Sequence, residues 1–413
     1  MAMRSLQGWM LAGLMLAATA PLVAASGGSA YSIIGMGDLR YIPNTRSMGM
    51  GYTGIGIADG NSLNAYAPAT WAAIKRTRLD AGFQYEGFKS TSGNTERYLA
   101  EGNFGGALLA LPVSTSHGIV FVGGFTPFSE ISYNVFTSGS QQGIDYKVNH
   151  TGTGGFTKGV AGFSYAPVEG LAFGASFDYL FGSIDDKRQF QPSSASFFGG
   201  TITENLTAKG SGFSVGALIA GSHISGHLSR LTIGVSASSR VSLATTRDLF
   251  YAYAIDRDTA SAVTGTAAIP ARIGIGAAYG IGERWLLAAD YAAQRWSSAD
   301  LSGFRGGDVR DSYRFGIGAE RNALHDPFSP WLDHLTYRIG FSYAATYYAV
   351  EGEGINAWAF TAGLGIPISG ETRLNISAEY GSRGTAALIK DNIFRLGISL
   401  DISELWFVQY GEE

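Results

Sequence analysis

Apolar and polar residues alternate along most of the chain after residue 75. Residues 79–86, LDAGFQYE, place Leu, Ala, Phe and Tyr on one side and Asp, Gly, Gln and Glu on the other. A period of two is typical of a strand with one apolar and one polar face. The same alternation predicts about 14 strands, which start near Arg78, Asn103, Gly118, Gly154, Leu171, Gly212, Leu231, Ala271, Trp285, Ser312, Thr336, Ala357, Arg373 and Asn392.

The residues on the apolar face are mainly Phe, Tyr, Leu and Ile. A soluble β-sandwich, the alternative fold, would present a polar outer face instead. A closed single-chain membrane barrel prefers an even number of strands and hides its hydrophobicity in every second residue. The pattern therefore predicts an all-β fold, a transmembrane antiparallel β-barrel over residues 76–413.

The connections between these strands alternate in length. Residues 167–170, 280–283 and 367–371 are short turns, whereas residues 185–204, 245–266 and 297–310 are long links. Barrels of this type have short periplasmic turns and long outer loops. Even-numbered strands should then end on the periplasmic side, and both termini should lie there. Residues 323–335 form a longer periplasmic link that has room for a short helix.

The segment before the strands follows neither period. Residues 31–71 are rich in Gly and contain Pro43 and Pro68, a composition that favours turns and irregular backbone. We expect residues 26–75 to form a plug in the barrel lumen, because several inward strand positions are glycine and leave space there. Gly49, Gly51 and Gly54 spell a dinucleotide-binding glycine pattern, but no βαβ unit surrounds them, so nucleotide binding is not supported.

The chain opens with the features of a secretory signal peptide. Arg4 precedes an apolar run over residues 9–24, which is shorter than the roughly 20 residues of a membrane-anchoring helix. We expect cleavage after Ala25, with Ala20 and Ala30 as alternative sites. The chain has no Cys and a formal charge of -4, so nothing suggests thiol chemistry or nucleic-acid binding.

Residues 48–71, MGMGYTGIGIADGNSLNAYAPATW, resemble the N-terminal hatch of the FadL-like outer-membrane transporters. Asp59 and the glycines match the hatch motif, and residues 67–69 replace its Asn-Pro-Ala turn with Ala-Pro-Ala. The resemblance implies a distant member with fourteen strands, closed by the hatch. It also implies passive uptake of a hydrophobic small molecule, such as a long-chain fatty acid, from an outer groove to a lumen pocket and sideways through the wall.

The candidate site has three parts. The plug part comprises Asp59, Asn61, Asn64 and Pro68, and the outer entrance comprises Phe250 and Tyr251, two large aromatic residues in a long link. Charged residues on the polar face of the strands must point into the lumen, because a charge on the lipid face costs about 2–4 kcal/mol. These lumen charges are Arg314, Arg338, Arg373, Arg395 and Glu379. We favour ion pairs with each other and with the plug over direct ligand contact.

Enzymatic and metal sites are not expected, and neither is a cofactor. His223 and His227 have the spacing of a helical metal pair, but Ser225 and Gly226 make the segment a turn. An outer-membrane lipid hydrolase would need His150 beside a Ser and an acid or amide, and no G-x-S-x-G elbow is present.

The expected partners are a hydrophobic small molecule, outer-membrane lipid and the barrel-assembly machinery, with no nucleic acid, for a monomer in the bacterial outer membrane. The main alternative is a non-transporting barrel of the same fold that shuttles or anchors exported proteins. Such a barrel should have a packed lumen without an apolar cavity.

Overall fold

The computed structural model describes residues 25–405, except residues 42–43, 142, 195–196, 222–225, 254–256, 305, 325 and 327. The expected signal peptide up to residue 24 and His223 lie outside the described residues. The barrel strands are β3 (Thr77–Ser92), β4 (Thr95–Ser114), β5 (Ile119–Gln141), β6 (Ile144–Val168), β7 (Leu171–Pro192), β8 (Gly200–Ala220), β9 (Leu231–Ser238), β10 (Val241–Ala252), β11 (Arg257–Ile269), β12 (Arg272–Ile281), β13 (Trp285–Gln294), β15 (Ser312–Arg321), β16 (Thr336–Val350), β17 (Glu353–Ser369), β18 (Thr372–Gly384) and β19 (Lys390–Glu404).

Two barrel strands are broken by kinks. β9 and β10 both pair with β8, and they are the periplasmic and outer parts of one strand. β12 pairs with β9 and β11 pairs with β10, so these two form the next strand, with Pro270 at the break. Proline cannot donate a ladder hydrogen bond, which explains the break. With β19 paired to β3, the sheet closes as an antiparallel barrel of 14 strands, and the predicted fold class is confirmed.

The outward face of the barrel is apolar and the inward face is polar, as the alternation predicted. Phe83, Phe121 and Phe213 are each more than half exposed on the outer face. Their strand neighbours Gln84, Val122 and Ser214 are buried. None of the helices in the described part of the chain is long and apolar enough to cross a membrane.

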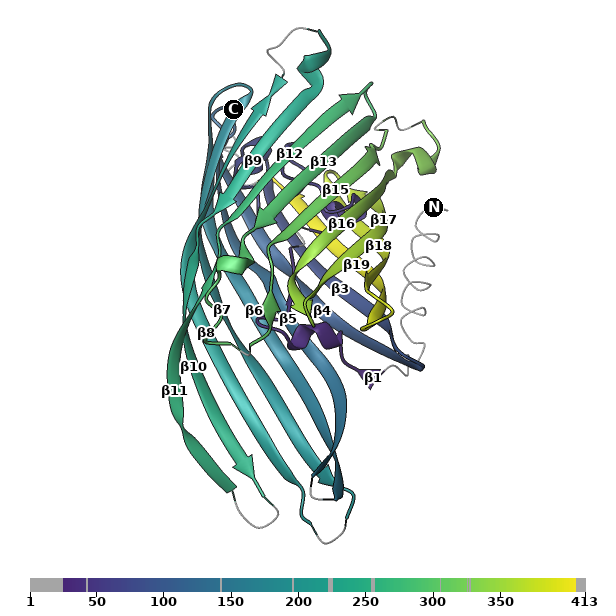
Figure 1. Cartoon of the computed structure of the whole chain (residues 1–413). Coiled ribbons are helices and arrows are strands. Elements are labelled where there is room, and N and C mark those ends of the chain that lie inside the picture. Colours follow the sequence, from purple (N-terminus) through teal and green to yellow (C-terminus); the bar gives the residue numbers. More distant parts are fainter. Residues whose placement is uncertain are drawn as a thin grey trace.

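The strands differ greatly in length. β5 to β8 have 23, 25, 22 and 21 residues, whereas β12, β13 and β15 have 10 each. About 10 residues suffice to span a membrane. The projecting parts of β5 to β8, together with β10 and β11, therefore form an outer sheet beyond the barrel, seen at the lower end of Figure 1.

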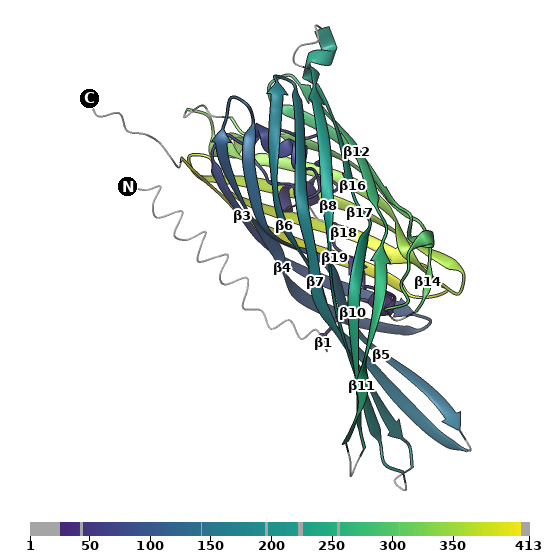
Figure 2. The ribbon, with the colours of Figure 1, turned by 90° about the vertical axis from the view of Figure 1, so that its left-hand side faces the viewer.

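The outer sheet corrects the predicted loops. Residues 185–204 and 245–266 were expected as long links, but β7 runs on to Pro192, β8 starts at Gly200, and β10 and β11 occupy most of the second link. These segments pair with each other along their whole length, which satisfies their backbone groups outside the membrane. Figure 2 shows the resulting hairpins extending below the barrel.

The N-terminal segment runs through the lumen. The shorter elements are β1 (Ala25–Ser26), η1 (Ala30–Ile33), β2 (Asp38–Leu39), α2 (Thr45–Gly49), η2 (Pro68–Ala73), η4 (Gly226–Arg230), η5 (Trp296–Ser298), β14 (Asp308–Val309) and η6 (Trp331–His334). Asn44 caps α2 by accepting a hydrogen bond from the N–H of Ser47. η2 lies against β7 and β6 near the short turns.

The barrel wall is split between β4 and β5. These strands pair only between the partners Ala107–Phe125 and Ser114–Ile119, at the periplasmic end. Toward the outer end, β1 pairs with β4 at residues 99–100 and β2 pairs with β5 at residues 129–130. Residues 25–39 thus line the split, and the described N-terminal end lies toward the outer side. The expectation that the N-terminus lies at the periplasmic side is wrong for residues 25–26.

The link after β15 contains η6, which fits the length of residues 323–335. Asp333 of η6 accepts hydrogen bonds from Arg321 and, at 3.1 Å, from Arg284. These two bonds lower the pKa of Asp333, with that of Arg321 contributing most. The link is therefore fastened to the ends of its neighbouring strands.

Candidate functional site in the barrel lumen

The plug backbone lies directly on glycines of the barrel wall. A Cβ added to Gly340 would come within 2.2 Å of the Gly51 nitrogen, and one added to Gly316 within 2.1 Å of the Gly51 oxygen. Gly363 contacts Gly49 in the same way, with its ideal Cβ 3.1 Å from the Gly49 Cα. Only residues without a side chain allow two backbones to approach so closely. The inward glycines thus seat the plug.

A buried ion network fastens α2 of the plug to the wall. Arg46 donates to Glu320 through Nε at 2.8 Å and through Nη2 at 2.6 Å. Arg338 donates to the same carboxylate at 2.6 Å and to Asn375 at 2.8 Å. Arg46 also pairs with Asp59 at 2.7 Å. One wall carboxylate therefore balances two guanidinium groups, and the plug supplies the second acid.

A second network lies near the wall split. Arg40 of the plug is paired with Glu86 and Glu130, and Arg395 is paired with Glu86 and Glu379. Glu101, which lies 3.4 Å from Arg40, completes the one group of three possible metal ligands found among the described residues, with Glu86 and Glu130. The Arg40 guanidinium already contacts all three carboxylates, so this group is an ion-pair network.

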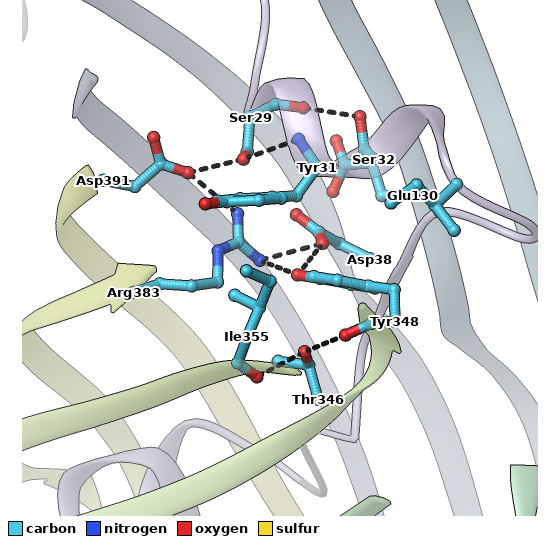
Figure 3. Close-up of polar contacts among 12 residues, drawn as sticks. Ser29, Tyr31, Ser32, Asp38, Glu130, Thr346, Tyr348, Ile355, Arg383 and Asp391 are labelled. Carbon is cyan, nitrogen blue, oxygen red and sulfur yellow. Dashed lines mark hydrogen bonds and ion pairs between the residues drawn. The ribbon is translucent and has the colours of Figure 1, made fainter. Parts of the chain in front are cut away.

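A third network ties the first residues of the plug to β16, β18 and β19 (Figure 3). Arg383 donates to Asp38 at 2.8 Å, and Tyr348 donates to the same oxygen at 3.0 Å. Asp391 accepts a hydrogen bond from Ser29 at 2.5 Å and pairs with Arg383 at 3.3 Å. These contacts hold the segment that lines the split.

The outer mouth of the lumen is filled by an apolar core. Trp296 of η5, Tyr347 and Ile355 have at most 1% of their surface exposed, and they pack with Phe156 and Leu243 of the outer sheet. Tyr31 and Met36 bring the plug into the same cluster. These apolar residues at the outer end of the barrel therefore close the lumen.

A cavity of about 140 Å³ lies between this core and the plug. Its lining is mainly polar or aromatic and includes Tyr41, Tyr52, Tyr66, Asp290, Gln294, Arg272, Arg314, Glu379 and Arg395. The Arg272 guanidinium lies over the rings of Tyr41 and Tyr66, at 5.1 and 5.3 Å from their centroids. Arg314 lies over Tyr52 at 4.5 Å. The positive charge of a guanidinium group is attracted to the face of an aromatic ring, so these tyrosines stabilise the two arginines.

The sequence comparison decides the family. The family model described as BamG matches residues 8–411, nearly the whole chain. The chain belongs to the BamG family. No curated protein matches it in sequence.

The BamG-family chain shares its fold with solved hydrophobic-compound channels. It is 16% identical to the Ralstonia pickettii toluene transporter TbuX, with a TM-score of 0.57, over 87% of this chain and 98% of that one. It is also 16% identical to the P. putida toluene transporter TodX, with a TM-score of 0.56, over 91% of this chain and 100% of that one. A Pseudomonas aeruginosa FadL homologue is 14% identical to it, with a TM-score of 0.57, over 88% of this chain and 99% of that one. The resemblance to FadL-like barrels, as a distant member, is confirmed at the level of fold.

The structure of this BamG-family barrel brings two of the predicted plug residues together, since the N–H of Asn61 donates to Asp59 at 3.0 Å, and gives Asn64 and Pro68 separate contacts. Asp59 belongs to the Arg46 network, and Asn61 lies 3.4 Å from Arg78 near the periplasmic end. Asn64 is buried, accepts the N–H of Tyr66, and borders the cavity. Pro68 starts η2 and lies against Gly174. Their role in ligand passage stays a prediction.

The predicted lumen charges point inward, but only some reach the cavity. Arg314, Arg395 and Glu379 line it, whereas Arg338 is committed to Glu320 and Asn375. Arg373 lies farther along β18, opposite Asp401 of β19.

The predicted outer entrance lies on a strand. Phe250 is 43% exposed on β10, between Thr203 of β8 and Thr259 of β11, and Tyr251 follows it. The expectation of a loop is wrong here, because the hairpin continues to Ala252. Neither residue borders the lumen cavity.

Sequence analysis missed the aromatic residues around the cavity. Tyr347 and Tyr348 are consecutive and both buried, which breaks the alternation of β16. That break is the signal that would have indicated a region packed on both faces. His150 donates to or accepts from Thr137 at 3.0 Å at an exposed position, so the geometry gives no support to the hydrolase alternative.

Proposed function

We propose that this BamG-family protein is an outer-membrane barrel that is closed to solutes and holds an exported partner protein at its outer sheet. The proposal follows the anchoring alternative, for which a packed lumen without an apolar cavity was the expected sign. The carrying observation is an open, uncharged strand edge on β11. The structure supports each of these two parts separately.

Two layers of packed residues separate the ends of the lumen in the part of the chain that the structure describes. The periplasmic part of the lumen is filled by plug backbone seated on wall glycines, and its outer part by the apolar core. The space between them has a volume of about 140 Å³, and its lining mixes apolar residues such as Ile55 and Ile393 with charged groups that include the Arg395–Glu379 ion pair. Apolar ligands prefer pockets of roughly 300–1,000 Å³ with few polar groups. A barrel built in this way is better suited to hold a partner than to conduct a lipid.

The outer sheet presents an edge that can accept another strand. Among the described residues, β11 pairs with β10 on one side. Its other edge is contacted near the barrel, where Ala268 bridges to Asp300 and the Thr266 carbonyl accepts from Ser302 at 3.3 Å, and no strand pairs with it farther out. Residues 259–267, TASAVTGTA, carry no charge and no proline. Natural sheets usually protect exposed edges with such residues, because an open edge pairs with other chains. An extended segment of an exported protein fits this edge by strand addition.

Proline at Val263 or at Thr264 should separate partner binding from folding. Successive residues of an antiparallel strand direct their N–H groups to opposite edges, so one variant removes a bond to β10 and the other removes a donor of the open edge. We expect the variant that removes a donor of the open edge to keep the stability of the parent. Its affinity for the partner should fall about tenfold, which is equal to about 1.4 kcal/mol.

A photo-crosslinking amino acid at Ala262 supplies the measurement in intact cells. We expect adducts with an exported protein, identified by mass spectrometry, that disappear in the edge-directed proline variant. The same crosslinker at Phe213, on the apolar outer face of the wall, is the control. Adducts that persist in both proline variants, or none at Ala262, would contradict the proposal.

Passage of a hydrophobic small molecule is the second candidate function. The specific observation is the wall split between β4 and β5, which residues 25–39 occupy. A lateral route would open if this segment moved aside. TbuX and TodX, which share the fold, are named toluene transporters.

Uptake measurements test this candidate. Replacing Phe250 and Tyr251 by Ser should weaken uptake of a hydrophobic probe into proteoliposomes by roughly tenfold if the outer hairpin captures it, since two large aromatic surfaces are lost. Tyr253→Ser, an exposed change at the same hairpin, is the control. Unchanged uptake in the double variant, or no uptake by the parent above empty liposomes, would count against passage.

A further inference from the structure

Two guanidinium groups at the lumen cavity have no acidic partner. Arg272 and Arg314 make cation–π contacts with Tyr41, Tyr66 and Tyr52. Within the described residues, neither guanidinium donates a hydrogen bond or forms an ion pair. The other arginines that line the cavity, described above, are all paired with carboxylates. A guanidinium carries five donors. Both side chains are only partly buried and line the cavity, so these donors are available to a ligand there.

The two side chains converge on one part of the cavity. Arg272 on β12 is opposite Gln294 of β13, and Arg314 on β15 is opposite Ala292 of the same strand. The two arginines are thus two strands apart and offset by two residues along the strand, a backbone separation of about 12 Å on the inward face. The Tyr41 hydroxyl donates to Gln294, the residue opposite Arg272. Two long side chains at this spacing can share one acceptor.

Most carboxylates that line the cavity already have ion-pair or hydrogen-bond partners. Glu379 and Asp38 are paired with the arginines described above. Asp290 accepts the N–H groups of Gly54 and Ile55 through one oxygen, at 2.7 and 2.8 Å, and its other oxygen has no hydrogen-bond partner. One incompletely used carboxylate therefore remains beside two unpaired guanidinium groups.

We propose that the cavity binds a small free oxyanion, of the phosphate or sulfate class, between Arg272 and Arg314. The guanidinium fork matches the oxygen spacing of such anions and binds them through paired hydrogen bonds. Ser312 and Ser342, which also line the cavity, offer further donors. The volume of about 140 Å³ accommodates a small anion with a few waters and leaves no space for an acyl chain. The anion is a structural component that links β12 to β15 across the closed lumen.

Selenate is the probe, because its anomalous scattering locates it directly in crystals of the full-length mature protein. We expect a peak within hydrogen-bonding distance of both guanidinium groups. In solution, thermal unfolding in detergent is followed as sulfate replaces chloride at constant ionic strength, and a saturable rise in Tm is expected.

Arg272→Gln combined with Arg314→Gln should abolish this rise, while Arg373→Gln, a lumen arginine away from the cavity, should keep it. Gel mobility before and after boiling establishes that each variant is folded. If the double variant does not fold, the selenate peak in the parent decides alone. Water at the site instead of selenate, a peak elsewhere from an adventitious ion only, or an equal sulfate response in the double variant would overturn the proposal.

Discussion

Glu320→Gln is expected to destabilise the seated plug by about 3–5 kcal/mol, the usual cost of removing one partner from a buried ion pair. Glu320 is the carboxylate that neutralises both Arg46 of the plug and Arg338 of the wall, at 2.6 to 2.8 Å. The glutamine keeps the shape but leaves two guanidinium groups facing a neutral amide. Because Arg46 belongs to the plug, the repulsion is relieved most easily by plug movement.

Planar-bilayer recordings measure the consequence as ion conductance. The parent should be closed, and the variant should show openings as the plug leaves its seat. Glu96→Gln is the control, since Glu96 pairs with Lys89 at 2.9 Å and the two side chains are 49% and 38% exposed. Exposed pairs contribute about 0–1 kcal/mol, so this control should stay closed. A closed Glu320→Gln barrel with unchanged stability would show that the network does not hold the plug.

Replacing Arg46, Glu320 and Arg338 together tests whether charge is needed between the plug and the wall. Asp59, the fourth member, is kept because its side chain is 30% exposed. Buried ion triads exchanged for apolar residues of similar volume are often equally or more stable. Arg46→Met, Glu320→Leu and Arg338→Met together should therefore restore a closed lumen that the single substitution loses. This rescue distinguishes loss of charge balance from a general packing defect.

The barrel was predictable because the membrane imposes one rule on every strand. Alternation marks each segment where one face meets lipid, and the kinked strands β9–β10 and β11–β12 still counted correctly as two. The outer sheet escaped this rule. Residues 185–204 and 245–266 lie beyond the lipid, so no apolar face is required there. Their strand pairing depends on contacts with neighbouring hairpins, which a local pattern does not carry.

The sequence predicted that charged residues in the lumen would form ion pairs, but it did not predict which residues pair with each other. Inward charges had to find partners, and Arg46 of the plug does pair with Glu320 of the wall. Asp59 pairs with Arg46 inside the plug. Which acid meets which arginine depends on where the plug lies along the barrel axis. That position is fixed by backbone contacts between glycines far apart in the sequence, such as Gly51 with Gly316 and Gly340. Arg272 and Arg314 became distinct from the other arginines only through this placement.

Gly340→Ala should unseat the plug with a single methyl group. The ideal Cβ at this position lies 2.2 Å from the Gly51 nitrogen and 2.4 Å from the Met50 carbonyl carbon. Both are backbone atoms, so no side chain can rotate away, and overpacking of this kind costs about 1–3 kcal/mol. Since β16 is held in the barrel on both edges by β15 and β17, the plug should move rather than the wall.

Conductance and trypsin cleavage at Arg46 measure the displacement. Arg46 is buried in the seated plug, so cleavage there should appear in Gly340→Ala and be absent from the parent. Gly123→Ala is the control, because its ideal Cβ has one neighbour within 4 Å, the Val160 oxygen at 3.7 Å. If Gly340→Ala remained closed and resistant to trypsin, the contact between the two backbones would have to be looser than the structure indicates. The inward glycines would then be only spacers in the wall and would not seat the plug.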